Sequence, residues 1–244
     1  MAKAVSVASC LTLILGVWCA QSGAAAVAVR SAVGFYALVR LDDCGLTVTE
    51  DTDVESQGAA LAPLAVSVSA NQACGDNWST SSGHVEASWA DVSSGAVHVE
   101  ASLDHHDDYP WQGYYMRYAG AAEPTYPGSD LPCWVYTFVP DTDGSFRLSY
   151  SSSHVGFDAD SWVIYGISFN GQGASIAARD NGSVCFSFSR GETCTVRLFT
   201  GTSWGGGSPS FYTWQTLSCS WEFDTAAVPV LGTTWGSVKA LYSE

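Results

Sequence analysis

The stretch WVYTFVPDTDGSFRLSYS, residues 134–151, shows the alternation of apolar and polar residues from which the fold can be predicted. In its second half, Phe146, Leu148 and Tyr150 alternate with polar residues, which places all three on one face of a strand. WVYTFVP at 134–140 also has strand composition, and the residues at 141–144 are typical of a hairpin turn. The stretch therefore predicts two antiparallel strands, each with one face toward a core.

Short segments of the same kind lie on both sides of this stretch. SVCFSFS at 183–189 repeats the alternation, and pairs such as Asn170-Gly171 supply turn signals. The acidic stretch DTDVESQGAALAP at 51–63 has the composition of a loop. We therefore expect an all-β fold, an antiparallel, jelly-roll-like β-sandwich of about ten strands. The expected strands are 33–41, 46–50, 64–70, 84–90, 96–103, 134–140, 145–151, 161–170, 174–179, 183–189, 194–200 and 211–223.

The charge balance of the chain excludes two classes of partner. Its 244 residues include 24 Asp and Glu against 9 Lys and Arg, a formal net charge of −15. Because no cluster of basic residues offsets this charge, nucleic acid and anionic membrane surfaces are repelled. The expected partner is a carbohydrate or an extracellular protein.

The first 26 residues have the composition of a secretory signal peptide. CLTLILGVWCA at 10–20 is apolar, and Ala24 and Ala26 provide the small residues that precede a cleavage site. We therefore predict cleavage after Ala26. Lipidation of Cys19 is the alternative, but the bulky Trp18 before it disfavours this reading.

The predicted domain organisation follows from this cleavage. A β-sandwich domain is expected at 27–225 and a C-terminal tail, a candidate sorting or anchoring segment, at 226–244. No other apolar run approaches the roughly 20 residues of a membrane-spanning helix. The sequence thus predicts a protein that is secreted or held at the cell surface, without a membrane span once the signal is removed.

Six cysteines follow the predicted signal peptide. An even number in an exported chain is typical of structural disulfide bonds, and six allow 15 connectivities. No CxxC pair is present, so a zinc ribbon or a thioredoxin-type site is not indicated. The candidates for up to three disulfides are Cys44, Cys74, Cys133, Cys185, Cys194 and Cys219.

The pentapeptide HVEAS occurs twice, at 84–88 and 98–102, and suggests a β-hairpin. A three-residue loop at 93–95, with Gly95 in the left-handed conformation, would pair Trp89 with Val99. His98 would then lie about 20 Å from His84 along the strands, too far to share a metal ion.

The same register makes Glu86 and Glu100 diagonal neighbours about 7–8 Å apart. Two carboxylates at that separation could serve an inverting glycoside hydrolase. The alternative, which we favour, is a solvated strand face.

A second candidate for metal binding follows directly after the repeat. In the sequence DHHDD at 104–108, Asp104, Asp107 and Asp108 could supply oxygen ligands to Ca²⁺ if this segment forms a loop. The alternative is a hydrophilic segment that keeps a sheet edge soluble. Ca²⁺ is therefore the one cofactor that the sequence suggests.

Aromatic residues gather in two segments that we expect to be loops, YPWQGYYMRY at 109–118 and TSWGGGSPSFYTW at 202–214. Exposed aromatic rings on the loops of a sandwich can stack on sugar rings or contact proteins, with their polar groups free to hydrogen-bond. The alternative is that these rings close the ends of the core. The candidate ligand-binding residues are Trp111, Tyr114, Tyr115, Trp204 and Tyr212.

Three segments give a weak resemblance to a known group of proteins: FVPDTDGSFRLSYS at 138–151, GISFNGQG at 166–173 and SVCFSFSRGETCTVRLF at 183–199. Over about residues 65–225 the chain resembles jelly-roll-like β-sandwich domains of secreted bacterial proteins of the PEP-CTERM-associated type. The resemblance implies surface adhesion or carbohydrate binding and carries no functional residues over. TTWGSVKALYSE at 233–244 is similar to a Trp-Gly…Lys-Ala-Leu-Tyr tail of exported bacterial proteins, whereas the apolar span and basic end of a PEP-CTERM tail are missing.

The sequence contains no local motif of a known catalytic site, such as G-x-S-x-G, HExxH or a P-loop. We therefore expect a non-catalytic bacterial extracellular module that binds glycans or mediates matrix and surface adhesion through loop aromatics. The first alternative is a purely structural cell-surface protein. The second is a glycoside-active enzyme that uses paired carboxylates such as Glu86 and Glu100.

Overall fold

The computed structural model describes residues 26–40, 48–106, 117–120, 133–156, 161–175, 181–204 and 210–225 of the chain. These residues form strands and turns, and none of them belongs to a helix long and apolar enough to cross a membrane. The strands are β1 Ala26–Arg40, β2 Val48–Gln57, β3 Leu64–Cys74, β4 Asn77–Asp91, β5 Ser94–His106, β6 Arg117–Gly120, β7 Trp134–Pro140, β8 Gly144–Val155, β9 Ser161–Phe169, β10 Gln172–Ser175, β11 Asn181–Phe188, β12 Cys194–Trp204 and β13 Ser210–Thr225.

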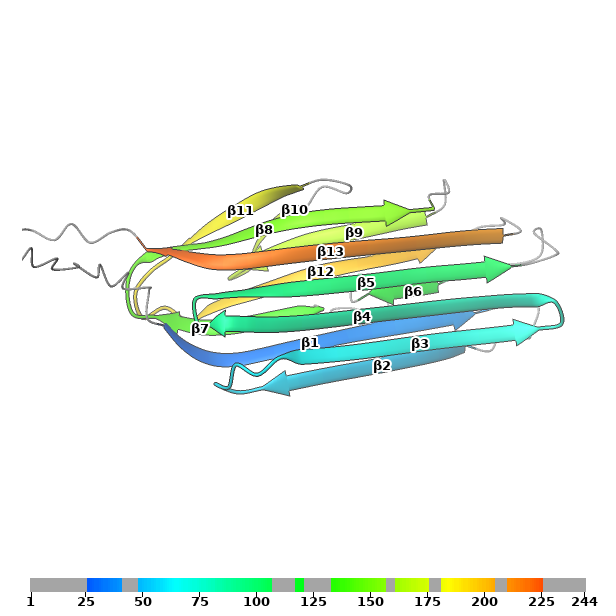
Figure 1. Ribbon diagram of the computed structural model, residues 1–244, viewed down its shortest axis with the longest axis horizontal. Coiled ribbons are helices and arrows are strands. Elements are labelled where there is room, and N and C mark those ends of the chain that lie inside the picture. The colour runs from blue at the N-terminus through cyan, green and yellow to red at the C-terminus, as the bar shows by residue number, and fades with distance from the viewer. Residues whose placement is uncertain are drawn as a thin grey trace, which may run out of the picture.

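The strands form two antiparallel sheets that pack face to face, which confirms the predicted β-sandwich (Figure 1). One sheet has the order β11-β8-β13-β5-β4-β3 and the other the order β10-β9-β12-β6-β1-β2. β7 belongs to the second sheet, where β6 and β7 pair with different parts of β1 and β12 and so occupy one position end to end. The sandwich thus consists of a six-stranded and a seven-stranded sheet.

A cluster of aromatic rings fills the space between the sheets. Trp134, Tyr136 and Phe138 alternate along β7, and each is fully buried. The ring of Phe138 lies 4.4 Å from that of Phe223 on the opposite sheet, and Tyr136 lies 5.0 Å from Trp221. Such contacts bury large apolar areas and add specific ring–ring attraction, so they dominate the stability of this core.

Two local predictions are wrong. The acidic segment that has loop composition is largely β2, an edge strand paired with β1 over Val48–Gln57. The segment at 141–144 does not close a hairpin, because β7 pairs with β1 and β12 whereas β8 pairs with β11 and β13. This turn instead carries the chain from one sheet to the other.

The hairpin formed by β4 and β5 exists, but its predicted register is wrong. The turn contains only Val92 and Ser93, and the partner of Val99 is Val85 instead of the predicted Trp89. The Asp91 carboxylate accepts hydrogen bonds from the backbone N–H of Ser93 at 2.7 Å and from two serine hydroxyls, which closes the tight turn. Partial burial raises the pKa of Asp91, but these hydrogen bonds outweigh it and leave the pKa below its usual value.

Gly95 does not serve as the left-handed turn residue, and it is required for a different reason. A Cβ atom at this position would lie 2.4 Å from the carbonyl oxygen of Ser88 and 2.7 Å from the ring of Trp221. The glycine therefore lets the Trp221 ring pack directly against the hairpin backbone. Odd-numbered residues of β4 still lie opposite odd-numbered residues of β5, as predicted. The buried side chains of β5 are therefore the expected ones, Val97, Val99, Ala101 and Leu103.

The sandwich is closed along one side by carboxylates of β2. Strands β2 and β3 are edge strands of opposite sheets and lie next to each other (Figure 1). Glu55 accepts a hydrogen bond from the backbone N–H of Ala65 at 2.9 Å, and Asp51 accepts one from Ser69 at 2.8 Å. These bonds satisfy edge groups of β3 that could otherwise pair with another chain.

We expect replacement of both Asp51 and Glu55 by alanine to lower the free energy of unfolding by about 2 kcal/mol, about 1 for each exposed hydrogen bond. Urea unfolding measures this change, and hydrogen exchange should become faster at the amides of Ala65 and Ser69. Asp53→Ala is the matched control, because Asp53 lies between the two and accepts none of the described hydrogen bonds. An equal loss in Asp53→Ala would contradict this role of the two carboxylates.

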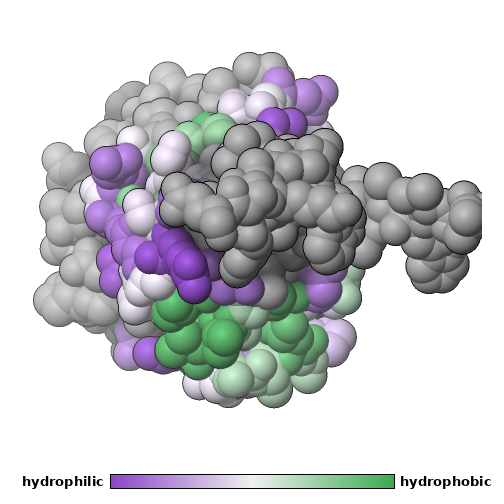
Figure 2. Space-filling view, turned by 90° about the vertical axis from the view of Figure 1, so that its left-hand side faces the viewer, coloured by the Kyte–Doolittle hydropathy of each residue, from purple (hydrophilic) through white to green (hydrophobic). Residues whose placement is uncertain are grey.

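The end of the sandwich at which β1 begins carries an apolar surface. Figure 2 looks onto this end and shows a hydrophobic area in its lower half, beneath a hydrophilic one. Val27 and Val29, at the start of β1, are exposed. The apolar surface is thus located at one end of the sandwich, whereas the outward side of the six-stranded sheet is polar.

No disulfide bond joins any two of the cysteines that the structure describes, so these residues do not form the predicted disulfide network among themselves. Cys133, Cys194 and Cys219 are buried thiols of the core, and Cys185 is an exposed thiol on β11. Burial raises the pKa of Cys133 to about 12 and that of Cys194 to about 11. Both groups are therefore protonated and unreactive at neutral pH. Cys44 lies outside the described residues.

Candidate functional site

The candidate site lies on the outer face of the six-stranded sheet, defined here as the side chains that point away from the seven-stranded sheet. Strand register places these side chains in rows across the sheet. One row contains Ser67, His84, Glu100 and Thr216, and the next contains Ala65, Glu86, His98 and Ser218. Both copies of the His-Val-Glu motif therefore lie in the middle of one exposed surface.

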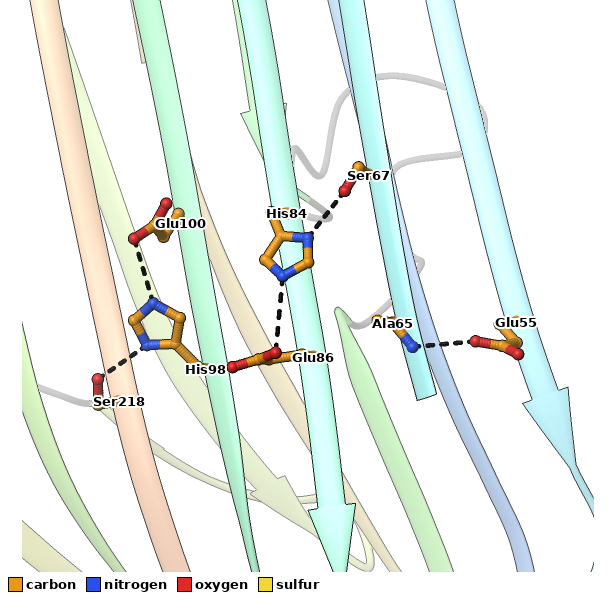
Figure 3. A network of polar contacts seen from close by, with 8 residues as sticks. All are labelled: Glu55, Ala65, Ser67, His84, Glu86, His98, Glu100 and Ser218. Carbon is orange, nitrogen blue, oxygen red and sulfur yellow. Dashed lines mark hydrogen bonds and ion pairs between the residues drawn. The ribbon is translucent and has the colours of Figure 1, made fainter. Parts of the chain in front are cut away.

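Each histidine of the repeat contacts a glutamate and a serine (Figure 3). The Nδ1 atom of His84 lies 2.8 Å from the hydroxyl of Ser67, and its Nε2 lies 3.9 Å from Glu86. The Nδ1 atom of His98 lies 2.9 Å from Ser218, and its Nε2 lies 3.3 Å from Glu100.

The two copies meet because a His-Val-Glu motif pairs well with an antiparallel copy of itself. When Val85 lies opposite Val99, His84 lies opposite Glu100 and Glu86 opposite His98. The two histidines are thus diagonal neighbours in the sheet, and the predicted separation of about 20 Å is wrong. Glu86 and Glu100 are diagonal neighbours as predicted, although through a different register.

A depression of about 210 Å³ opens on the outer face beside this cluster. Trp214 of β13 forms an aromatic side of it, and His84 and Glu100 contribute an imidazole and a carboxylate. Hydroxyls of Ser67, Ser82 and Ser102 complete the polar lining. One aromatic surface surrounded by converging hydrogen-bonding groups is the arrangement expected of a small-molecule site.

Two further depressions lie along the same strands. One of about 250 Å³ is lined by Glu86, His98 and Ala96, together with residues of β3 and β13. The other, of about 500 Å³, is lined by Ala96, Ser220 and Glu222 among others. The small side chains of Ala96 and Ser220 leave these hollows between larger neighbours.

Of the five candidate aromatic residues, the structure describes the exposure of Tyr212. Tyr212 is 49% exposed on the outer face, but it belongs to strand β13, not to a loop. Trp204 ends strand β12, and Trp111, Tyr114 and Tyr115 lie outside the described residues. Trp78, 38% exposed and stacked on His106, and Trp214 are the outer-face aromatics that the prediction did not single out. Alternation along β4 and β13 could have identified both.

The predicted Ca²⁺ loop is not a loop where the structure describes it. Asp104, His105 and His106 belong to β5, and His105 points into the core while its two neighbours lie on the outer face. Asp107 and Asp108 lie outside the described residues. Within the part of the chain that the structure describes, no three His, Cys, Asp or Glu side chains are grouped so that they could hold a metal ion.

Among the depressions that the structure describes, the two carboxylates proposed for an enzyme line different ones. Glu100 lines the one beside Trp214, whereas Glu86 lines the next one along the sheet. A glycoside hydrolase needs both carboxylates on either side of one scissile bond.

Comparison with known proteins identifies no relative of this chain. The chain matches no protein-family model, and no curated protein or solved structure is significantly similar to it.

Proposed function

We propose that this protein is an exported, non-catalytic glycan-binding module and that the outer face of the six-stranded sheet is its binding surface. The observation that carries the proposal is the depression that combines Trp214 with His84, Glu100 and three serines. A sugar ring has an apolar face that stacks on an aromatic ring and a rim of hydroxyls that need hydrogen-bond partners. This depression offers both within a volume suited to a small ring.

Two exposed aromatic residues support the assignment of the outer face as the binding surface. Tyr212 lies on the outer face one row beyond the depression, and Trp78 lies two rows beyond it. Exposed aromatic rings beside a polar depression can extend the area over which sugar rings stack. The predicted export and the acidic charge agree with a ligand outside the cell.

A glycan array with the folded protein, recorded with and without Ca²⁺, tests this proposal. We expect binding to one class of glycan and loss of about thirtyfold in affinity in Trp214→Ala, the effect typical of a central aromatic contact. Tyr36→Ala, on the seven-stranded sheet, is the control and should bind normally. Circular dichroism should show that both variants fold.

Two results would reject the proposal. If the array shows no binding under either condition, the protein is better described as a structural surface protein. If binding is unaffected by Trp214→Ala, the binding surface lies elsewhere on the chain.

A further inference from the structure

The three depressions of the outer face follow one another along β4, β5 and β13, and we call this row of depressions the groove. Those near Glu86 and Glu222 share Ser88 and Ala96 in their linings. The depression beside Trp214 ends at the row of Glu100, directly next to the row of Glu86. Trp214 and Glu222 are eight residues apart on β13, which corresponds to about 26 Å along the strand. A groove of this length exceeds one sugar ring and suits a linear chain.

Each depression contains one carboxylate. Glu100 lines the first, Glu86 the second and Glu222 the third. The basic side chains in the described linings are the imidazoles of His84 and His98, which contact Glu86 and Glu100, and no lysine or arginine is among the lining residues. Arg147 lies opposite Glu222 on β8, but its guanidinium forms an ion pair with Asp224. The groove therefore presents negative charges at intervals, on a chain whose formal net charge is −15.

We propose that this groove binds a linear glycan with free amino groups, of the glucosamine-polymer class; this inference rests on the glycan-binding function proposed above. Protonated amines of successive sugars would pair with Glu100, Glu86 and Glu222, while Trp214 stacks on a ring at one end. An acidic glycan would be repelled by the same carboxylates. A neutral glycan would offer these carboxylates hydroxyl hydrogen bonds without an opposite charge, so it would bind less tightly than a protonated amine sugar.

Isothermal titration calorimetry with glucosamine oligomers of two to six units tests the inference, with N-acetylated oligomers of equal length as the uncharged comparison. At a pH that keeps the sugar amines protonated, the free-amine oligomers should bind more tightly, and affinity should increase with length and fall with added salt. Glu86→Gln and Glu222→Gln should each weaken binding about one-and-a-half- to fivefold, the value of one exposed ion pair. Asp53→Asn on β2 removes the same charge outside the groove and should leave binding unchanged.

The outcomes separate this inference from the function on which it rests. Trp214-dependent binding of neutral glycans, without a preference for free amines, would overturn the inference and keep the proposed function. Equal weakening by Asp53→Asn and Glu86→Gln would show unspecific attraction to an acidic protein and would overturn the inference. Absence of binding to every oligomer and to the glycan array would overturn both.

Discussion

Replacement of Phe138 by alanine is expected to lower the free energy of unfolding by about 3–5 kcal/mol, as buried phenylalanine deletions typically do. Phe138 is fully buried at the centre of the aromatic cluster. Its ring lies 4.4 Å from that of Phe223, 5.4 Å from Tyr136 and 5.7 Å from Phe188. The substitution removes contacts within one sheet and between the two sheets at once, so neighbouring rings cannot close the cavity without moving a strand.

Urea unfolding followed by fluorescence measures this loss. Val135→Ala is a suitable comparison, because Val135 lies on the same strand but is only half-buried on its other face. We expect Val135→Ala to cost about 1 kcal/mol. Similar losses in the two variants would show that the aromatic cluster does not hold the two sheets together.

Alternation was sufficient to predict the sandwich and most of its strands. It predicts which side chains enter the core wherever one face of a strand is apolar, as for Phe146 and Leu148. It finds only the start of β2, because the rest of this edge strand is rich in carboxylates, two of which bond to the backbone of β3. Alternation also fails to predict the path of the chain after β7. The same turn residues can connect two neighbouring strands of one sheet or lead the chain to the other sheet.

The candidate site could be predicted only in part, because it depends on pairings between distant segments. The repeat indicates that β4 and β5 pair, but Asp91 sets their register by closing a two-residue turn. Trp214 reaches the cluster only because β13 pairs with β5, more than 100 residues earlier in the sequence. No local pattern specifies that pairing, so the line of depressions is visible only in the folded chain.

Gly83→Ala is expected to lower the free energy of unfolding by about 3 kcal/mol, at the upper end of the usual cost of overpacking. A Cβ atom at Gly83 would lie 1.9 Å from the ring of Phe35, which is buried beneath β4 and cannot turn away freely. Gly83 thus provides the space through which β1 packs against the six-stranded sheet.

A double-mutant cycle tests whether this single contact is the cause. Phe35→Ala alone should cost about 3–5 kcal/mol by leaving a cavity, but adding Gly83→Ala to it should cost at least about 1 kcal/mol less than in the wild-type background. Gly166→Ala on β9, where a Cβ meets no atom within 4 Å, controls for the backbone effect of the substitution and should change stability by less than about 0.5 kcal/mol. Urea unfolding of the five proteins gives the coupling directly. If the cost of Gly83→Ala is the same with and without the Phe35 ring, strand flexibility rather than ring packing explains the glycine. If Gly83→Ala costs less once the Phe35 ring is removed, the position requires glycine because this ring of the opposite sheet packs directly against the backbone of β4.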